Sequence, residues 1–254
     1  MTFDLQKANM WKRISAFILD IILVCVVSTG AMLVLSAITG YDNYSEKLNG
    51  FYSSYEEQYN IESFDIAEEE YNNLSKKERD TYDKAYKALI SDDEVLYTYS
   101  MVINLTMLIT SLGILLTFLL LEFVIPLLFG NGQTVGKKIF GLCLVRRDGV
   151  KVNTLMLFVR TFLGKYTVET MIPLLLIIML FFGSVGVTGL IVIGLIFLLQ
   201  IILIFSTENR TAIHDAFSQT VVTDMASQMI FDSYEELLAY KKKEAAEKAQ
   251  RETY

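Results

Sequence analysis

The chain has few cysteines and histidines, the residues that build disulfides and many metal sites: among 254 residues it has two cysteines and one histidine. It also has only two prolines. A single histidine excludes a metal site with two histidine ligands. Cys25 lies in an apolar run and Cys143 in a basic loop, so no disulfide between them is expected. HExxH and nucleophile-elbow motifs are absent, and GQTVGKK at 132–138 lacks the P-loop spacing. We therefore expect no enzyme activity, cofactor or metal.

Long apolar segments are what the sequence has in excess. Hydrophobic residues make up 53% of the chain, and the mean hydropathy is +0.40. About 20 apolar residues cross the roughly 30 Å of a bilayer core, and residues 14–39 and 101–129 are each long enough. The run 167–205 is long enough for two crossings, with a glycine-rich turn, GSVGVTG, at 183–189. The sequence therefore predicts an all-α polytopic membrane protein with four transmembrane helices.

Charge differs sharply between the predicted loops. The insert 41–99 has 15 acidic and six basic residues, whereas the loop 130–166 and the amino-terminal segment are rich in lysine and arginine. Loops rich in lysine and arginine stay on the cytoplasmic side, so we expect both termini to be cytoplasmic. The expected location is the plasma membrane of the cell. Lys137 and Lys138 are expected to face lipid headgroups. Nothing in the sequence indicates nucleic-acid binding.

These observations divide the chain into six segments. Ser75 and Glu78 form a predicted capping box that opens a helix inside the tyrosine-rich insert, so the insert is read as a small helical extracytoplasmic cap or, alternatively, a solvated acidic spacer. Asp148–Gly149 between apolar runs predicts a short cytoplasmic β-hairpin. The segments are 1–39 (amino terminus and first span), 40–99 (insert), 100–129 (second span), 130–166 (basic loop), 167–206 (third and fourth spans) and 207–254 (cytoplasmic tail).

Ionisable residues next to or inside the spans are the candidate functional groups. Asp20 lies inside the first apolar run, where burying a charge costs at least ~2.5 kcal/mol, so it needs a partner or water. It either pairs with an arginine to lock helices together or exchanges protons for cations. His214 and Asp215 either tether the chain below the fourth span, with Asp215 facing Arg210 or Lys137, or relay protons. The candidate charge network is Arg13, Asp20, Glu122, Arg160, Arg210, His214 and Asp215.

Three segments in order along the chain resemble the RDD family of bacterial membrane proteins, which is named for an arginine and two aspartates. The resemblance does not cover the insert 41–99, and Ser218–Gln219 replaces an Ala-Gly pair that many members have. The matching residues are Arg13, Ala16 and Asp20; then Gly132, Thr134, Gly136, Lys137, Gly141, Leu142, Val145 and Gly149; then Arg210, His214, Asp215, Thr220 and Val222, with Arg160 between the second and third blocks.

The resemblance implies the architecture more than the mechanism, since some members are linked to cation/proton exchange and most have no assigned role. We expect an accessory or scaffold component of the bacterial cell membrane. The alternative is an ion-coupled transporter that exchanges cations for protons through Asp20 and arginine partners. The expected partners are membrane lipids, and either another membrane protein or a second copy of the chain.

Overall fold

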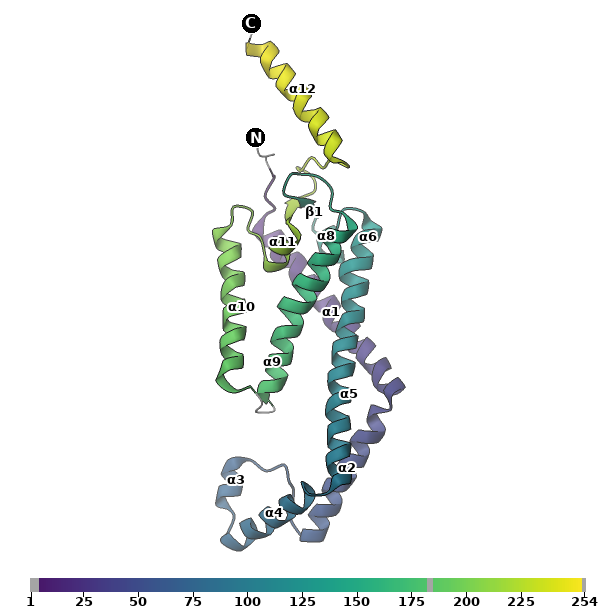
Figure 1. The fold of residues 1–254 in the computed structure, drawn as a ribbon, viewed down its shortest axis with the longest axis vertical. Helices are drawn as coiled ribbons and strands as arrows, with labels where there is room; N and C mark the ends of the chain where they lie inside the picture. The colour runs from purple at the N-terminus through teal and green to yellow at the C-terminus, as the bar shows by residue number, and fades with distance from the viewer. Residues whose placement is uncertain (1–4, 182–184, 253–254) are drawn as a thin grey trace. The chain divides into compact units, whose positions relative to one another are not determined.

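The protein is an all-α polytopic membrane protein with one small antiparallel sheet (Figure 1). The computed structural model describes residues 5–181 and 185–252. Four helical segments are long and apolar enough to cross a membrane: Met10–Thr39, Asp93–Phe129, Thr154–Leu180 and Gly186–Ser206. The predicted number of spans is therefore confirmed. The chain forms two compact units, one of Thr29–Gly113 and one of Met1–Ser28 with Ile114–Tyr254.

The smaller unit contains the tyrosine-rich insert, which is helical as expected. Gly40, with φ at 68°, separates the end of α1 (Met10–Thr39) from α2 (Tyr41–Tyr59). After α3 (Glu68–Asn73), the predicted capping box forms at the start of α4 (Lys76–Leu89). Leu48, Leu89 and Val95 form the buried core that joins α2, α4 and the start of α5 (Asp93–Phe118).

The second and third spans each contain a π-helix, and both π-helices lie in the larger unit. In the second span, η1 (Leu119–Val124) lies between α5 and α6 (Ile125–Phe129). In the third span, η2 (Val159–Met171) lies between α8 (Thr154–Phe158) and α9 (Ile172–Phe181). The fourth span is α10 (Gly186–Ser206).

The helix of the third span begins at Thr154, ahead of the apolar run 167–205. Its charged residues meet protein partners and do not interrupt the helix. The glycine-rich turn predicted at 183–189 is shorter, since α10 already begins at Gly186. Residues 183 and 184 of that turn lie outside the described residues.

The sheet joins segments that are far apart in the sequence. β1 (Leu142–Arg146) pairs antiparallel with β2 (Thr220–Asp224), so that Leu142 lies opposite Asp224. The short helices α7 (Val135–Ile139) and α11 (Ile213–Ser218) directly precede these two strands. The two strands pair their backbone hydrogen-bonding groups with each other, and all but the last residue of each strand is buried.

The predicted local hairpin needs a correction. The Asp148–Gly149 turn forms, with Gly149 at φ 87° and its N–H donating to the Arg146 carbonyl at 3.0 Å. The returning segment pairs with β1 through a single bridge, between Val145 and Lys151, and the ladder is formed with β2 instead. Every residue of β1 except the last is buried, so this strand is covered on both faces by distant parts of the chain.

The amino end of α1 packs directly against the sheet. Ala8 and Ala16 belong to the same buried cluster as Leu142, Leu144 and Val222. Small side chains at these positions let the first span approach the strands closely. Beyond the sheet, Val150, Phe231 and Leu237 form a separate cluster that fixes the start of α12 (Tyr234–Glu252).

Candidate functional site: a buried charge cluster

Asp20 caps the start of α7 and does not pair with an arginine. Its side chain is buried, and its two carboxylate oxygens accept hydrogen bonds from Thr134 Oγ1 at 2.5 Å and from the Gly136 N–H at 2.8 Å. The first N–H groups of a helix have no partner inside the helix, so the carboxylate satisfies one of them. The prediction that Asp20 pairs with Arg13, Arg160 or Arg210 is therefore replaced by a capping contact between the first span and the loop.

Gly136 is required for this contact because α1 and α7 lie very close together. A Cβ on Gly136 would lie 2.3 Å from the Ala16 carbonyl oxygen and 2.8 Å from Asp20 Oδ1. Ala16 itself is only 2% exposed. Glycine, alanine and aspartate thus form one interlocking contact, which explains the matching residues in two separate sequence blocks.

Lys137 is buried, which corrects the expectation that it faces lipid. Its Nζ lies 3.2 Å from Thr134 Oγ1, next to the Asp20 contact. Burial lowers the pKa of Lys137 to about 8, and Lys165 adds to this effect, whereas Glu122 and Asp20 oppose it. Lys138 is exposed and lies 3.6 Å from the centre of the Phe129 ring, so it keeps the predicted surface position.

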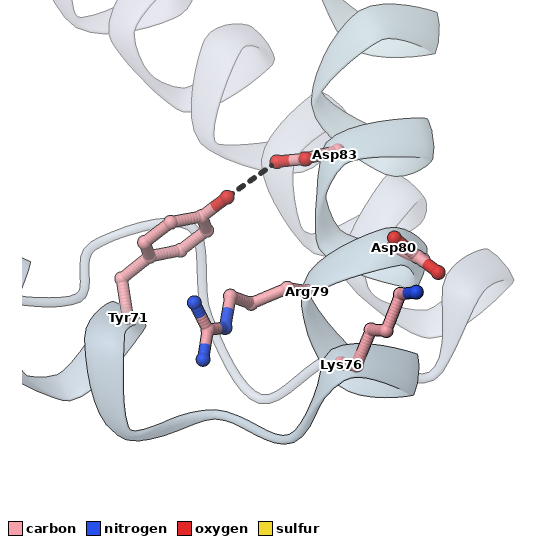
Figure 2. A pocket seen from close by; sticks show the side chains of 5 residues that line it. All are labelled: Tyr71, Lys76, Arg79, Asp80 and Asp83. Atoms are coloured by element: carbon pink, nitrogen blue, oxygen red, sulfur yellow. Dashed lines mark hydrogen bonds between the residues drawn. The ribbon is translucent and has the colours of Figure 1, made fainter.

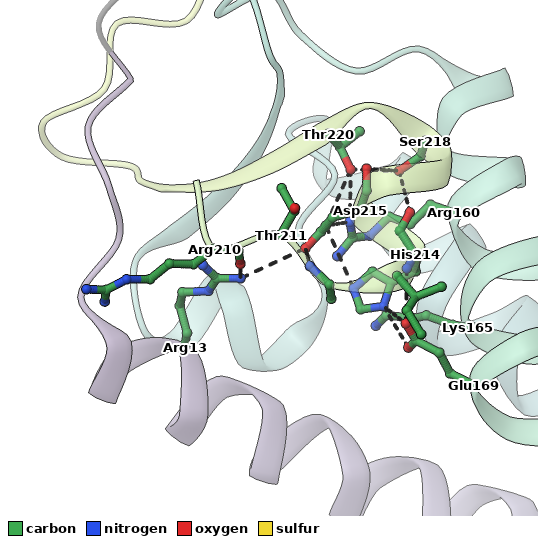
Figure 3. Close-up of polar contacts among 12 residues, drawn as sticks. Arg13, Arg160, Lys165, Glu169, Arg210, Thr211, His214, Asp215, Ser218 and Thr220 are labelled. Carbon is green, nitrogen blue, oxygen red and sulfur yellow. Dashed lines mark hydrogen bonds and ion pairs between the residues drawn. The ribbon is translucent and has the colours of Figure 1, made fainter. Parts of the chain in front are cut away.

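Arg160 and Asp215 form the central ion pair of the cluster (Figure 3). Both side chains are almost fully buried, and Arg160 also donates to Thr220 Oγ1 at 2.9 Å. Asp215 Oδ2 accepts from the Ala212 N–H at 3.1 Å, so the same carboxylate caps α11. Burial alone would raise the pKa of Asp215, but the neighbouring Arg160 holds it well below its usual value.

Arg13 connects the first span to this ion pair. Its Nη2 lies 3.9 Å from Asp215 Oδ2 and donates to the Arg210 carbonyl at 2.9 Å. Arg210 has a positive φ of 50° and an exposed side chain. Arg210 therefore contributes through its backbone carbonyl, and the predicted contact from its guanidinium to Asp215 is made by Arg160 and Arg13.

His214 binds a carboxylate from the third span. Its Nδ1 lies 2.8 and 2.7 Å from the two oxygens of Glu169, and its backbone N–H donates to Glu169 Oε1 at 3.0 Å. Burial lowers the pKa of His214, with Arg160 adding to the effect, and the nearby carboxylates Asp215 and Glu169 oppose it. The neutral ring is then the Nδ1–H donor to Glu169.

Glu122 and Lys165 form a second buried ion pair, between the second and third spans. Lys165 Nζ lies 2.5 Å from Glu122 Oε2, and their side chains are 13% and 6% exposed. Thr161 Oγ1 also donates to the Glu122 carbonyl at 2.8 Å. The Glu122 side chain therefore binds a residue of a neighbouring helix.

The π-helical geometry of η2 places three charged residues on one face. Arg160, Lys165 and Glu169 follow one another at spacings of five and four residues. An α-helix has 3.6 residues per turn, so Arg160 and Glu169 would lie on opposite sides. The i→i+5 hydrogen bonds of a π-helix widen the turn and bring residues four or five apart above one another. This single face meets Asp215, Glu122 and His214.

Sequence reasoning did not assign Lys165 and Glu169 to the cluster. Both lie where the apolar run 167–205 begins or just before it, so they looked like residues at a membrane boundary. The usable signal was the spacing of Arg160, Lys165 and Glu169 ahead of a long apolar segment, together with the need of each charge for a partner.

A separate pocket with polar and charged lining lies on the insert (Figure 2). It is lined by Tyr71, Lys76, Arg79, Asp80 and Asp83. The Tyr71 hydroxyl donates to Asp83 at 2.8 Å, and Arg79 Nε donates to the Leu74 carbonyl at 3.0 Å. These side chains hold α3 to α4 within the insert.

The chain was compared with curated proteins, solved structures and protein families. Neither the curated proteins nor the solved structures contain a match to this chain. A family model described as the RDD family matches residues 7–219, a range that contains the whole buried charge cluster. The chain is therefore a member of the RDD family.

Proposed function

We propose that this protein is a non-transporting accessory or scaffold component of the bacterial cell membrane, without enzyme activity. The observation that supports this best is that the carboxylates at the spans are bound by other groups of the protein. Asp20 is bound by Thr134 and Gly136, Glu122 by Lys165, and Glu169 by His214. Groups engaged in this way hold helices together.

The proposed role also follows from which elements the cluster connects. Within the larger unit, its contacts join α1 to α7, η1 to η2, and η2 to α11. A buried pair that loses one partner leaves an uncompensated charge, which typically destabilises a protein by ~3–5 kcal/mol. The cluster therefore favours one fixed arrangement, which is what a docking platform requires.

The proposed orientation places the sheet and both termini in the cytoplasm. Lysine and arginine are concentrated in the amino-terminal segment and in residues 130–166, whereas the insert is acidic. In this orientation exposed bases such as Lys138 meet anionic lipid headgroups. The proposed partners are these lipids and a second membrane protein that docks on the fixed face.

Cation/proton exchange is the second candidate, and one observation favours it. His214 lies between two carboxylates, with Nδ1 against Glu169 and Nε2 3.8 Å from Asp215 Oδ1. A titratable ring between two acids is an arrangement that can pass protons. In this candidate the exchange centre would be His214 and Glu169, since Asp20 is bound at the start of α7.

Ion flux in proteoliposomes separates the two candidates. Purified wild type, Asp20→Asn and Glu169→Gln would be reconstituted with a pH-sensitive dye inside and exposed to gradients of H⁺, Na⁺ and K⁺. The accessory role predicts no cation-dependent pH change above that of protein-free liposomes, and lower thermal stability for Asp20→Asn. Cation-dependent flux in wild type that disappears in a folded Glu169→Gln variant would contradict the accessory role and support exchange.

A further inference from the structure

Asn104 is a polar side chain on the exposed surface of a membrane-spanning helix. It lies in α5, within the candidate span Asp93–Phe129. The exposed Tyr97 and Tyr99 precede it, and tyrosines of this kind mark the membrane interface. At 1.5 Å per residue, Asn104 lies about 8–11 Å further along the helix, inside the apolar layer.

The amide of Asn104 has hydrogen-bonding capacity left over in this position. Its Nδ2 donates to Ser100 Oγ on the same helix, at a long 3.4 Å. A side-chain amide has two donor hydrogens and an acceptor oxygen with two lone pairs, so this bond uses one of four positions. Lipid tails offer no partner for the others, which makes contact with another polar group favourable.

Asn104 also lies on a seam with the spacing of a coiled coil. Tyr97, Met101, Asn104, Leu108 and Ser111 follow one another at spacings of four, three, four and three residues. Tyr97 is 58% and Leu108 45% exposed. On another side of the same helix, Val95, Thr98 and Ile109 are buried. A seven-residue repeat of this kind packs two helices along one seam.

We propose that two copies of this chain associate in the membrane through this seam of α5, with the two Asn104 amides hydrogen-bonded to each other. Copies in one membrane have the same orientation, so a two-fold axis along the membrane normal brings each residue to its own counterpart. An amide is self-complementary because it both donates and accepts. A single asparagine in such a seam also fixes the register and the number of helices.

This inference does not depend on the accessory role, since a transporter would use the same seam. The test is FRET between full-length copies labelled at the amino terminus with donor or acceptor and diluted into increasing amounts of lipid. We expect a dimer whose Kd rises about 3- to 20-fold in Asn104→Leu, the range given by interhelical hydrogen bonds in membranes. Asn104→Gln, which keeps the amide, should recover most of the affinity.

A matched control and a cross-linking experiment test the seam itself. Thr106→Val removes a hydroxyl that bonds the Val102 carbonyl of its own helix at 2.8 Å, and should leave the Kd unchanged. In a Cys25→Ser background, Leu108→Cys should form a disulfide-linked dimer on oxidation, and Leu96→Cys, exposed on another side of α5, should not. Monomeric wild type at every dilution, an unchanged Kd in Asn104→Leu, or equal cross-linking at both positions would overturn the proposal.

Discussion

Single residues at the contact between α1 and α7 leave little room for substitution. Asp20 reaches the start of α7 because Gly136 has no Cβ that would meet the Ala16 carbonyl oxygen and the Asp20 carboxylate. The contact needs an acid on one helix and the absence of a Cβ on the other. A hydrogen bond between a carboxylate and backbone N–H groups is charge-assisted and is stronger than a neutral one.

Gly136→Ala should destabilise the protein by disrupting the close contact between α1 and α7. The new Cβ would lie 2.3 Å from a backbone oxygen, so α7 must move away from α1. Overpacking costs about 1–3 kcal/mol, and losing the Asp20 hydrogen bonds adds to it. Unfolding in detergent micelles measures the effect. Gly194→Ala is the control, because no atom lies within 4 Å of its Cβ, and equal stability of the two variants would contradict the close contact.

His214 should make the stability of the protein depend on pH between 7 and 5. Its pKa is lower in the folded protein than in the unfolded chain, where it is about 6.5. The unfolded chain therefore binds a proton that the folded protein does not, and the free energy of unfolding falls as the pH drops below about 6.5. The pKa of Asp215 is also lowered, but the stability that its ionised form contributes is lost only below about pH 4.

The measurement compares unfolding of wild type and His214→Asn across this pH range. An asparagine amide can donate to Glu169 in place of Nδ1–H but does not titrate. For wild type, one proton gives the free energy of unfolding a slope of at most about 1.4 kcal/mol per pH unit between pH 7 and 5. We expect this slope to be smaller in the variant. A slope that is the same in both proteins would assign the pH dependence to other groups.

At the scale of elements, η2 is the part of the fold that organises the cluster. Its wide turn places Arg160, Lys165 and Glu169 toward three different partners. π-Helices are rare and occur frequently at functional sites. The close packing of α11 against η2 also depends on Gly164, whose added Cβ would lie 2.6 Å from His214 Cα.

Exchanging two side chains of η2 tests its register. In an α-helix, residue 167 would lie on the same face as Arg160, seven residues earlier. In the π-helix, Glu169 has that position and Thr167 is exposed. The double variant Thr167→Glu with Glu169→Thr should therefore lose the contact to His214 and destabilise the protein by about 1–3 kcal/mol. Glu169→Gln, which keeps an acceptor oxygen, should be milder, and a fully stable exchange variant would indicate an α-helical register.

The elements could be predicted from sequence where local patterns decide them. The four spans and the Ser75–Glu78 capping box follow from apolar length and cap residues. The partner of β1 could not be predicted, because β2 lies far along the chain and only tertiary packing selects it over the local hairpin. The π-helix was also not predictable, since its register depends on partners supplied by other elements.

At the scale of the whole molecule, the residues that belong to the charge cluster could be predicted from the sequence more successfully than their interaction partners. The candidate residues were chosen because charges near a membrane need partners. Arg13, Arg160, His214 and Asp215 do gather in one cluster, and Glu122 joins it through Lys165. Asp20 and Lys137 meet at Thr134 instead. Charge type alone does not distinguish an arginine from a helix terminus as the partner of a carboxylate.

The buried ion pairs act within the larger unit as connections between helices. Glu122 and Lys165 join η1 and η2 at 2.5 Å with little solvent exposure. A buried pair of this kind destabilises the fold strongly when one partner is removed and much less when both are replaced by neutral groups.

A double-mutant cycle on Glu122 and Lys165 measures how strongly the two side chains stabilise the fold together. Unfolding in detergent would be measured for wild type, Glu122→Gln, Lys165→Met and the double variant. We expect each single change to cost ~3–5 kcal/mol and the double variant to cost clearly less than the sum of the two. Strictly additive single effects would show that the two residues stabilise the fold independently and would contradict the role assigned to the charge cluster.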